Sequence, residues 1–191
     1  MRTNLSKQNG FTLVEIMVAT SIFMVIMIVA LGALITSSDT AKKAQALRTA
    51  MDNVSFAMES MTRSLRMGTN YTCGNTVSLD GSSPTDCPSG AGAVAFVPYS
   101  GLGVLPRTVA YKLNQRADNT FALQRCNPTC LDMVSSDVNV DYLKFFLNGS
   151  SSTLDTIQPS ISILIRGTVT IKGQGTVFAI QTSVSQRSAE Y

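Results

Sequence analysis

The feature that most constrains this chain is an uninterrupted apolar run near its start. Residues Ile16–Thr36 are 21 positions without a charge, rich in Ile, Val, Met, Leu and Ala. As an α-helix, this run spans roughly 30 Å, the thickness of a bilayer hydrocarbon core. Residues 1–10 carry Arg2 and Lys7 and no acid, so we expect them to stay in the cytoplasm while the rest crosses. The run is too long for the apolar part of a secretory signal peptide, which makes a plain signal anchor the simpler alternative.

Glu15 is unexpected in a plain anchor, because it lies at the cytoplasmic start of the apolar run. A carboxylate within a membrane segment costs about 2–4 kcal/mol, and anchoring does not need it. A cut after Gly10 would supply a cation, because the new α-amino group of Phe11 would lie in the first turn. It would be beside Glu15 or beside the Glu15 of a neighbouring chain. In a low-dielectric setting that pair is strong, and leaving it unmade is costly.

These residues carry a resemblance to a known family. The segment Lys7–Gln8–Asn9–Gly10, followed by Phe11–Thr12–Leu13–Val14–Glu15 and the apolar run, resembles the signal of type IV prepilins and type II secretion pseudopilins. The resemblance implies that prepilin peptidase cuts between Gly10 and Phe11 and methylates the new N-terminal Phe11. It also implies that Glu15 serves docking and assembly. The implied partners are other pilin or pseudopilin subunits, an inner-membrane assembly platform and membrane lipid.

Beyond the apolar run the pattern becomes that of an amphipathic helix. Between residues 39 and 67, apolar side chains recur at steps of three and four: Leu47, Ala50, Val54, Ala57, Met58, Met61 and Leu65. We interpret this stripe as packing against the following domain rather than as a cofactor site. A single helix over residues 12–67 would be roughly 80 Å long. Gly68 is predicted as its C-cap. Gly32, in mid-run, either permits local melting or serves as a small residue for helix contact.

The rest of the chain is predicted to form a β-rich head, with no helical pattern between its strands. Residues 68–92 are rich in Gly, Ser, Pro, Asn and Asp and are predicted as loop. Alternating runs predict six strands: Ala93–Val97, Thr108–Leu113, Thr120–Arg125, Val138–Leu147, Ser160–Arg166 and Thr176–Ser185. We therefore expect an α+β fold of the type IV pilin-like kind, in which a long N-terminal helix packs on an antiparallel sheet. The expected divisions are a leader (1–10), an assembly helix (11–38), an amphipathic helix (39–67) and the head (68–191).

The four cysteines, Cys73, Cys87, Cys126 and Cys130, all follow the apolar run. An even number in a region poor in charge fits an oxidising compartment. The local pairing, Cys73–Cys87 and Cys126–Cys130, closes the shortest loops, and the second bridge would staple a tight turn. A four-thiolate zinc site is the alternative, although the usual paired cysteines two residues apart are absent.

Composition narrows the classes of function. The chain has no His, which removes imidazole zinc sites and His-based acid–base catalysis. Residues 11–191 carry 13 basic and 12 acidic side chains, so charge gives no case for direct nucleic-acid binding. The stretch Asp137–Asp141 resembles part of a calcium loop but lacks its glycine and distal Glu, so a strand is favoured. No catalytic constellation is present, and we expect no enzyme activity, no metal and no cofactor.

The combined prediction is a minor pilin or pseudopilin subunit of a type IV pilus or type II secretion-like filament. It would be single-pass in a bacterial inner membrane with its head extracytoplasmic, and later part of a filament in the periplasm or at the cell surface. The runs Gln158–Gly167 and Gly175–Arg187 resemble the chain ends of the minor-pilin W and pseudopilin J branch. Two alternatives stay open, a membrane-anchored extracytoplasmic binding protein that does not polymerise and a secreted head released by signal peptidase.

Overall fold

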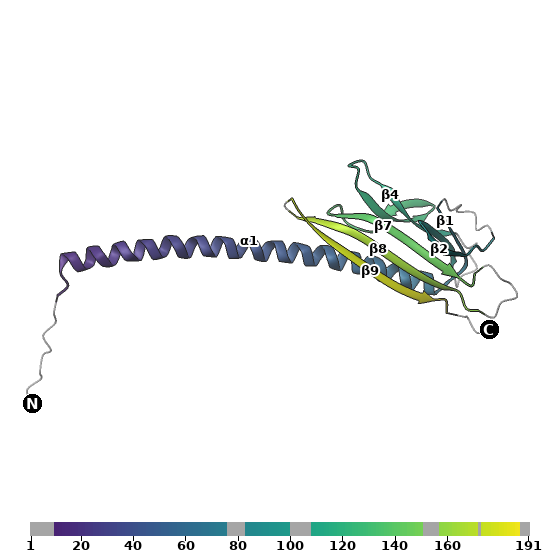
Figure 1. The fold of residues 1–191 in the computed structure, drawn as a ribbon, viewed down its shortest axis with the longest axis horizontal. Helices are drawn as coiled ribbons and strands as arrows, with labels where there is room; N and C mark the ends of the chain where they lie inside the picture. Colours follow the sequence, from purple (N-terminus) through teal and green to yellow (C-terminus); the bar gives the residue numbers. More distant parts are fainter. Residues whose placement is uncertain (1–9, 76–82, 100–107, 151–156, 172, 188–191) are drawn as a thin grey trace, which may run out of the picture. The chain divides into compact units, whose positions relative to one another are not determined.

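The computed structural model describes residues 10–75, 83–99, 108–150, 157–171 and 173–187 (Figure 1). One helix, α1 (Leu13–Arg66), is followed by the strands. The chain divides into two compact units, one ending at Gln45 and the other beginning at Ala46, so α1 contributes to both. An α+β layout with a long apolar helix followed by antiparallel sheets is therefore confirmed.

In the first unit, α1 has no apolar partner within the described residues. Every side chain from Leu13 to Lys42 is exposed, including the whole apolar run. The helix passes Gly32 without a break. It is long and apolar enough to cross a membrane, and its most apolar window is not buried at all. A helix that is apolar all round must be surrounded by lipid or by other helices.

In the second unit, one stripe of α1 is buried in the head, as the spacing predicted. The buried residues are Ala50, Val54, Ala57, Met58, Met61 and Leu65, and Leu47 is partly buried against them. They share one core cluster with side chains from both sheets of the head. Burying such side chains stabilises a fold by about 1.5–3 kcal/mol each for the larger ones, which is ample to hold this half of α1 in place.

The head contains two antiparallel sheets rather than one. The first has the order β1-β3-β4-β5-β6 and the second the order β2-β7-β8-β9. Their strands are β1 (Gly68–Gly74), β2 (Cys87–Ala91), β3 (Ala93–Pro98), β4 (Val109–Gln115), β5 (Phe121–Asn127), β6 (Thr129–Asp132), β7 (Val138–Asn148), β8 (Ser160–Ile171) and β9 (Gln174–Ser185). All six predicted strands are present, with somewhat different ends. The clean alternation of burial along β7 and β8 is the pattern that made them predictable.

The prediction of a loop over residues 68–92 was wrong, because β1 and β2 both lie there. Their turn-rich composition hides strands that form by long-range pairing, β1 with β3 and β2 with β7. Pro88 is tolerated because β2 is an edge strand, where a missing N–H need not leave a partner unpaired. The short strand β6 was also missed, since it is only 4 residues long and every one of them is exposed.

Gly68 does not cap α1 as predicted, because its φ is not positive and it begins β1. A Cβ there would lie 2.4 Å from the ring of Phe96, so glycine is needed for close packing instead. The last carbonyl groups of α1 are satisfied from the head. The hydroxyl of Tyr71 lies 2.6 Å from the carbonyl oxygens of Leu65 and Gly68. The backbone N–H of Arg187 donates to the carbonyl of Arg66 (2.8 Å).

Candidate functional site: the N-terminal segment of α1

The start of α1 is built around Thr12, which caps the helix. The backbone N–H of Glu15 donates to the Thr12 hydroxyl (3.3 Å), and the N–H of Ile16 donates to the Thr12 carbonyl (3.3 Å). The first N–H groups of a helix have no partner within it, and a threonine in this position satisfies one of them. This role of Thr12 was not predicted above. The signal was present, because Thr12 and Glu15 form the spacing of a capping box.

Glu15 lies in the first turn of α1 and is exposed. The positive end of the helix dipole favours an acid there by about 0.3–1 kcal/mol. Within the described residues its carboxylate has no ion pair, and the side chain of Phe11 is exposed as well. The chain on its own therefore presents Gly10, Phe11 and Glu15 together at an accessible helix start. Gly10 lies outside the helix and is exposed.

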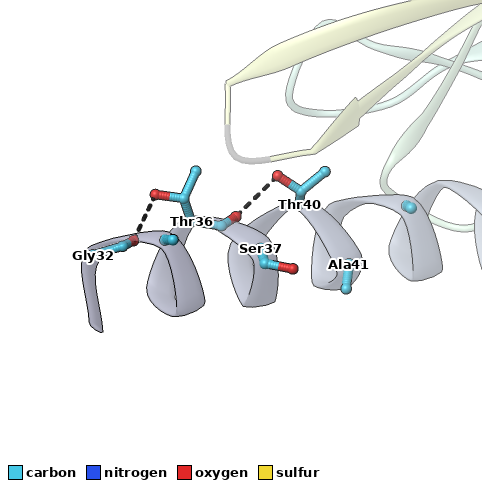
Figure 2. Close-up of a pocket in the computed structure, with 7 residues that line it drawn as sticks. Gly32, Thr36, Ser37, Thr40 and Ala41 are labelled. Atoms are coloured by element: carbon cyan, nitrogen blue, oxygen red, sulfur yellow. Dashed lines mark hydrogen bonds between the residues drawn. The ribbon is translucent and has the colours of Figure 1, made fainter. Parts of the chain in front are cut away.

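Further along the same unit, small side chains leave a shallow hollow on one side of α1 (Figure 2). It is lined by Gly32, Ala33, Thr36, Ser37, Thr40, Ala41 and Ala44. The hydroxyl of Thr36 donates to the carbonyl of Gly32 and that of Thr40 to the carbonyl of Thr36, each at 3.0 Å. The hydroxyls of Thr36 and Thr40 are thus hydrogen-bonded within the helix, and no charged side chain lines the hollow. α1 is continuous at Gly32 in the single chain, and the two roles predicted for that glycine, melting in a packed filament and close helix contact, both stay predictions.

All four cysteines are joined in disulfides, Cys73 with Cys87 and Cys126 with Cys130, which is the local connectivity. The first bridge links β1 to β2 and therefore joins the two sheets. The second crosses the hairpin of β5 and β6, where Cys126 and Cys130 are paired residues. No thiolate is left to bind zinc, and no group of metal-binding side chains occurs among the residues described.

Arg116 makes several hydrogen bonds in the head and holds a loop in place. Its guanidinium donates to Asp132 (2.7 Å) and to the carbonyls of Val134, Ser135 and Val138. Burial raises the pKa of Asp132, but hydrogen bonds from Arg116 and Gln124 outweigh burial and hold the pKa below its usual value. Val138–Asp141 lie in β7, as the strand interpretation predicted, and Asn139 donates to Asp141.

Comparison with known proteins bears on this N-terminal segment alone. Residues 5–31 match the family model described as the prokaryotic N-terminal methylation motif, and the match includes Gly10, Phe11 and Glu15. No curated protein and no solved structure matches the chain. The motif is the signal of type IV pilins, and it implies processing by prepilin peptidase and assembly with other pilins. The chain thus carries a type IV pilin signal ahead of a long apolar helix and antiparallel sheets, a layout consistent with a type IV pilin-like protein.

Proposed function

We propose that the chain is a minor pilin or pseudopilin subunit of a type IV pilus or type II secretion-like filament, acting as a building element and not as an enzyme. The observation that carries this is the methylation motif over residues 5–31, which overlaps the start of a helix whose apolar run, Ile16–Thr36, is exposed throughout. Prepilin peptidase cuts after Gly10 and methylates Phe11. The helix then holds the chain in the inner membrane, with the head outside the cytoplasm.

Assembly exchanges lipid around α1 for the helices of neighbouring subunits. Lipid tails are as apolar as the side chains they replace, so this exchange is nearly neutral in hydrophobic free energy. Register must therefore come from polar pairs and close packing. Glu15 supplies one such pair by meeting the Phe11 amine of a neighbour. At about 4 Å and an effective dielectric constant near 20, an amine and a carboxylate attract by about 4 kcal/mol before desolvation is subtracted.

The test is Glu15→Ala, compared with Glu59→Ala on the same helix. Glu59 is an exposed acid paired only with Arg63 at 3.3 Å, and losing that pair costs about 0.5 kcal/mol or less. We expect both variants to insert and be cleaved after Gly10. The amount of protein found in sheared filaments should fall tenfold or more for Glu15→Ala and should stay unchanged for Glu59→Ala. Normal incorporation of Glu15→Ala into filaments would refute the assembly role proposed for Glu15.

A membrane-anchored binding protein that does not polymerise is the second candidate, favoured by the size of a head with two sheets. Intact mass spectrometry of the native protein without reduction separates the two. A chain beginning at methylated Phe11 supports the filament subunit, and a chain that keeps residue 1 supports the tethered binding protein. A start beyond residue 30 would indicate release by signal peptidase. The same spectrum reports whether all four cysteines are oxidised.

A further inference from the structure

The last strand of the head, β9, is an open sheet edge (Figure 1). It pairs along its full length of 12 residues with β8 on one side. Within the described chain, no backbone group of residues 175–185 is hydrogen-bonded to any element other than β8. Alternate residues of an edge strand direct both N–H and C=O outward. This edge therefore presents a row of unused donors and acceptors.

Other edges of the described sheets are protected, and β9 is not. β6 is 4 residues long and ends in Asp132, and β2 contains Pro88 and an irregular register. β1 is partly covered by a bridge from Thr72 to Thr85. In contrast, β9 contains no charge and no proline, and its side chain at Val177 is 70% exposed. Natural sheets usually blunt a long edge with charge or proline, so an unprotected one indicates a binding edge.

The outer face beside this edge carries Arg166 and Lys144 against one acid, Asp141, whose carboxylate accepts a hydrogen bond from the Thr168 hydroxyl (3.0 Å). Tyr142, Arg166 and Ala179 are paired residues on β7, β8 and β9, so they form one row across the sheet. The guanidinium of Arg166 lies 5.8 Å from the centre of the Tyr142 ring and has no carboxylate partner in the described structure. Lys144 occupies the next row. Because Ala179 is small, a carboxylate on an added strand opposite it would be within reach of Arg166.

We propose that β9 binds an extended, acidic segment of another protein, which adds to the four-stranded sheet as a fifth strand. Backbone hydrogen bonds to β9 would supply affinity. Apolar side chains on one face of the segment would lie beside Phe178, Ile180 and Val184, which share the inward face of β9. A carboxylate on the other face would meet Arg166.

A second copy of the chain is the less suitable occupant. β9 itself contains no acidic residue, so a second β9 would bring no carboxylate to Arg166.

The experiment is amide hydrogen exchange on the full chain in detergent micelles, with a defined probe. The probe is a short synthetic peptide of alternating Val and Thr with a central Glu, and its partner probe has Lys in place of Glu. We expect the outward amides of β9 to exchange quickly in the free protein and slowly with the Glu peptide. The Lys peptide should bind about tenfold more weakly, because an attraction becomes a repulsion.

Arg166→Gln should weaken binding of the Glu peptide roughly twofold to fivefold, as expected for one partly exposed ion pair. The matched control is Arg125→Gln, an exposed arginine on β5 in the other sheet, which should change nothing. Equal effects of the two substitutions would overturn the proposal, as would β9 amides that are as slow as those of β7 in the free chain. Protection of β9 that depends only on protein concentration would assign the edge to a second copy instead. Glu15→Ala should leave peptide binding unchanged. The proposed filament function and the proposed binding at β9 can therefore fail independently.

Discussion

Removing the hydroxyl of Tyr71 should loosen the junction between α1 and the head. Tyr71 is 1% exposed, and its hydroxyl lies 2.6 Å from the carbonyl oxygens of both Leu65 and Gly68. Burial raises the pKa of this hydroxyl well above its usual value, so it stays protonated and can donate. Tyr71→Phe keeps the ring against Phe96 and leaves the carbonyl groups at the end of α1 without this donor.

The magnitude follows from the burial of the acceptors. A buried polar group that loses its partner costs about 1–3 kcal/mol. For a domain of this size, that corresponds to a fall in melting temperature of roughly 4–10 °C. The assay is thermal and urea unfolding of the full chain in detergent, followed by near-ultraviolet circular dichroism of the head. The linear urea dependence gives the free energy of unfolding directly.

Tyr111→Phe is the matched control. Tyr111 is fully buried and also stacks on the Phe96 ring, with ring centres 5.8 Å apart. Its hydroxyl has no hydrogen-bond partner among the described residues. Removing it should leave stability unchanged within about 0.5 kcal/mol or raise it, because an unpaired buried hydroxyl is itself unfavourable. If the two variants lose the same stability, the tyrosines matter only through their rings and the capping role of Tyr71 is refuted.

Two further predictions concern the head. Burial raises the pKa of Asp132, but the hydrogen bonds from Arg116 and Gln124 and the charge of Arg116 together lower that pKa below its usual value. The stabilising contribution of Asp132 is therefore complete above the unfolded pKa of about 3.9 and is lost as pH falls through the lower folded value. Urea titrations across acidic pH should show this loss, and Arg116→Gln should remove it, whereas an unchanged pH slope in that variant would contradict the assignment. Gly167→Ala should cost about 1–3 kcal/mol, because the new Cβ would lie 2.3 Å from the carbonyl oxygen of Asn139. Gly92→Ala, whose nearest neighbour is at 3.7 Å, should be nearly neutral in the same melts, and equal losses would rule out close packing as the cause.

Local patterns carried most of what the sequence predicted. The motif around Gly10, Phe11 and Glu15, the apolar run and the stripe from Leu47 to Leu65 depend only on residues close together in the chain. A helix and a membrane segment are short-range structures, so their periodicity and charge can be read directly. The six strand-like runs were predictable for the same reason, most clearly where burial alternates along β7 and β8. The capping role of Thr12 is also a local pattern, because Thr12 and Glu15 have the spacing of a capping box.

Long-range pairing determined the features of the head that local patterns did not predict. β1 and β2 form from a turn-rich stretch because distant strands and the Cys73–Cys87 bridge hold them, and no local pattern records that. The arrangement of two sheets, the ring of Phe96 against Gly68 and the donors that cap α1 arise only when the head closes. The open edge of β9 belongs to this group as well. Its sequence shows a strand, but whether a strand lies at the centre or the edge of a sheet depends on which neighbours the fold brings to it.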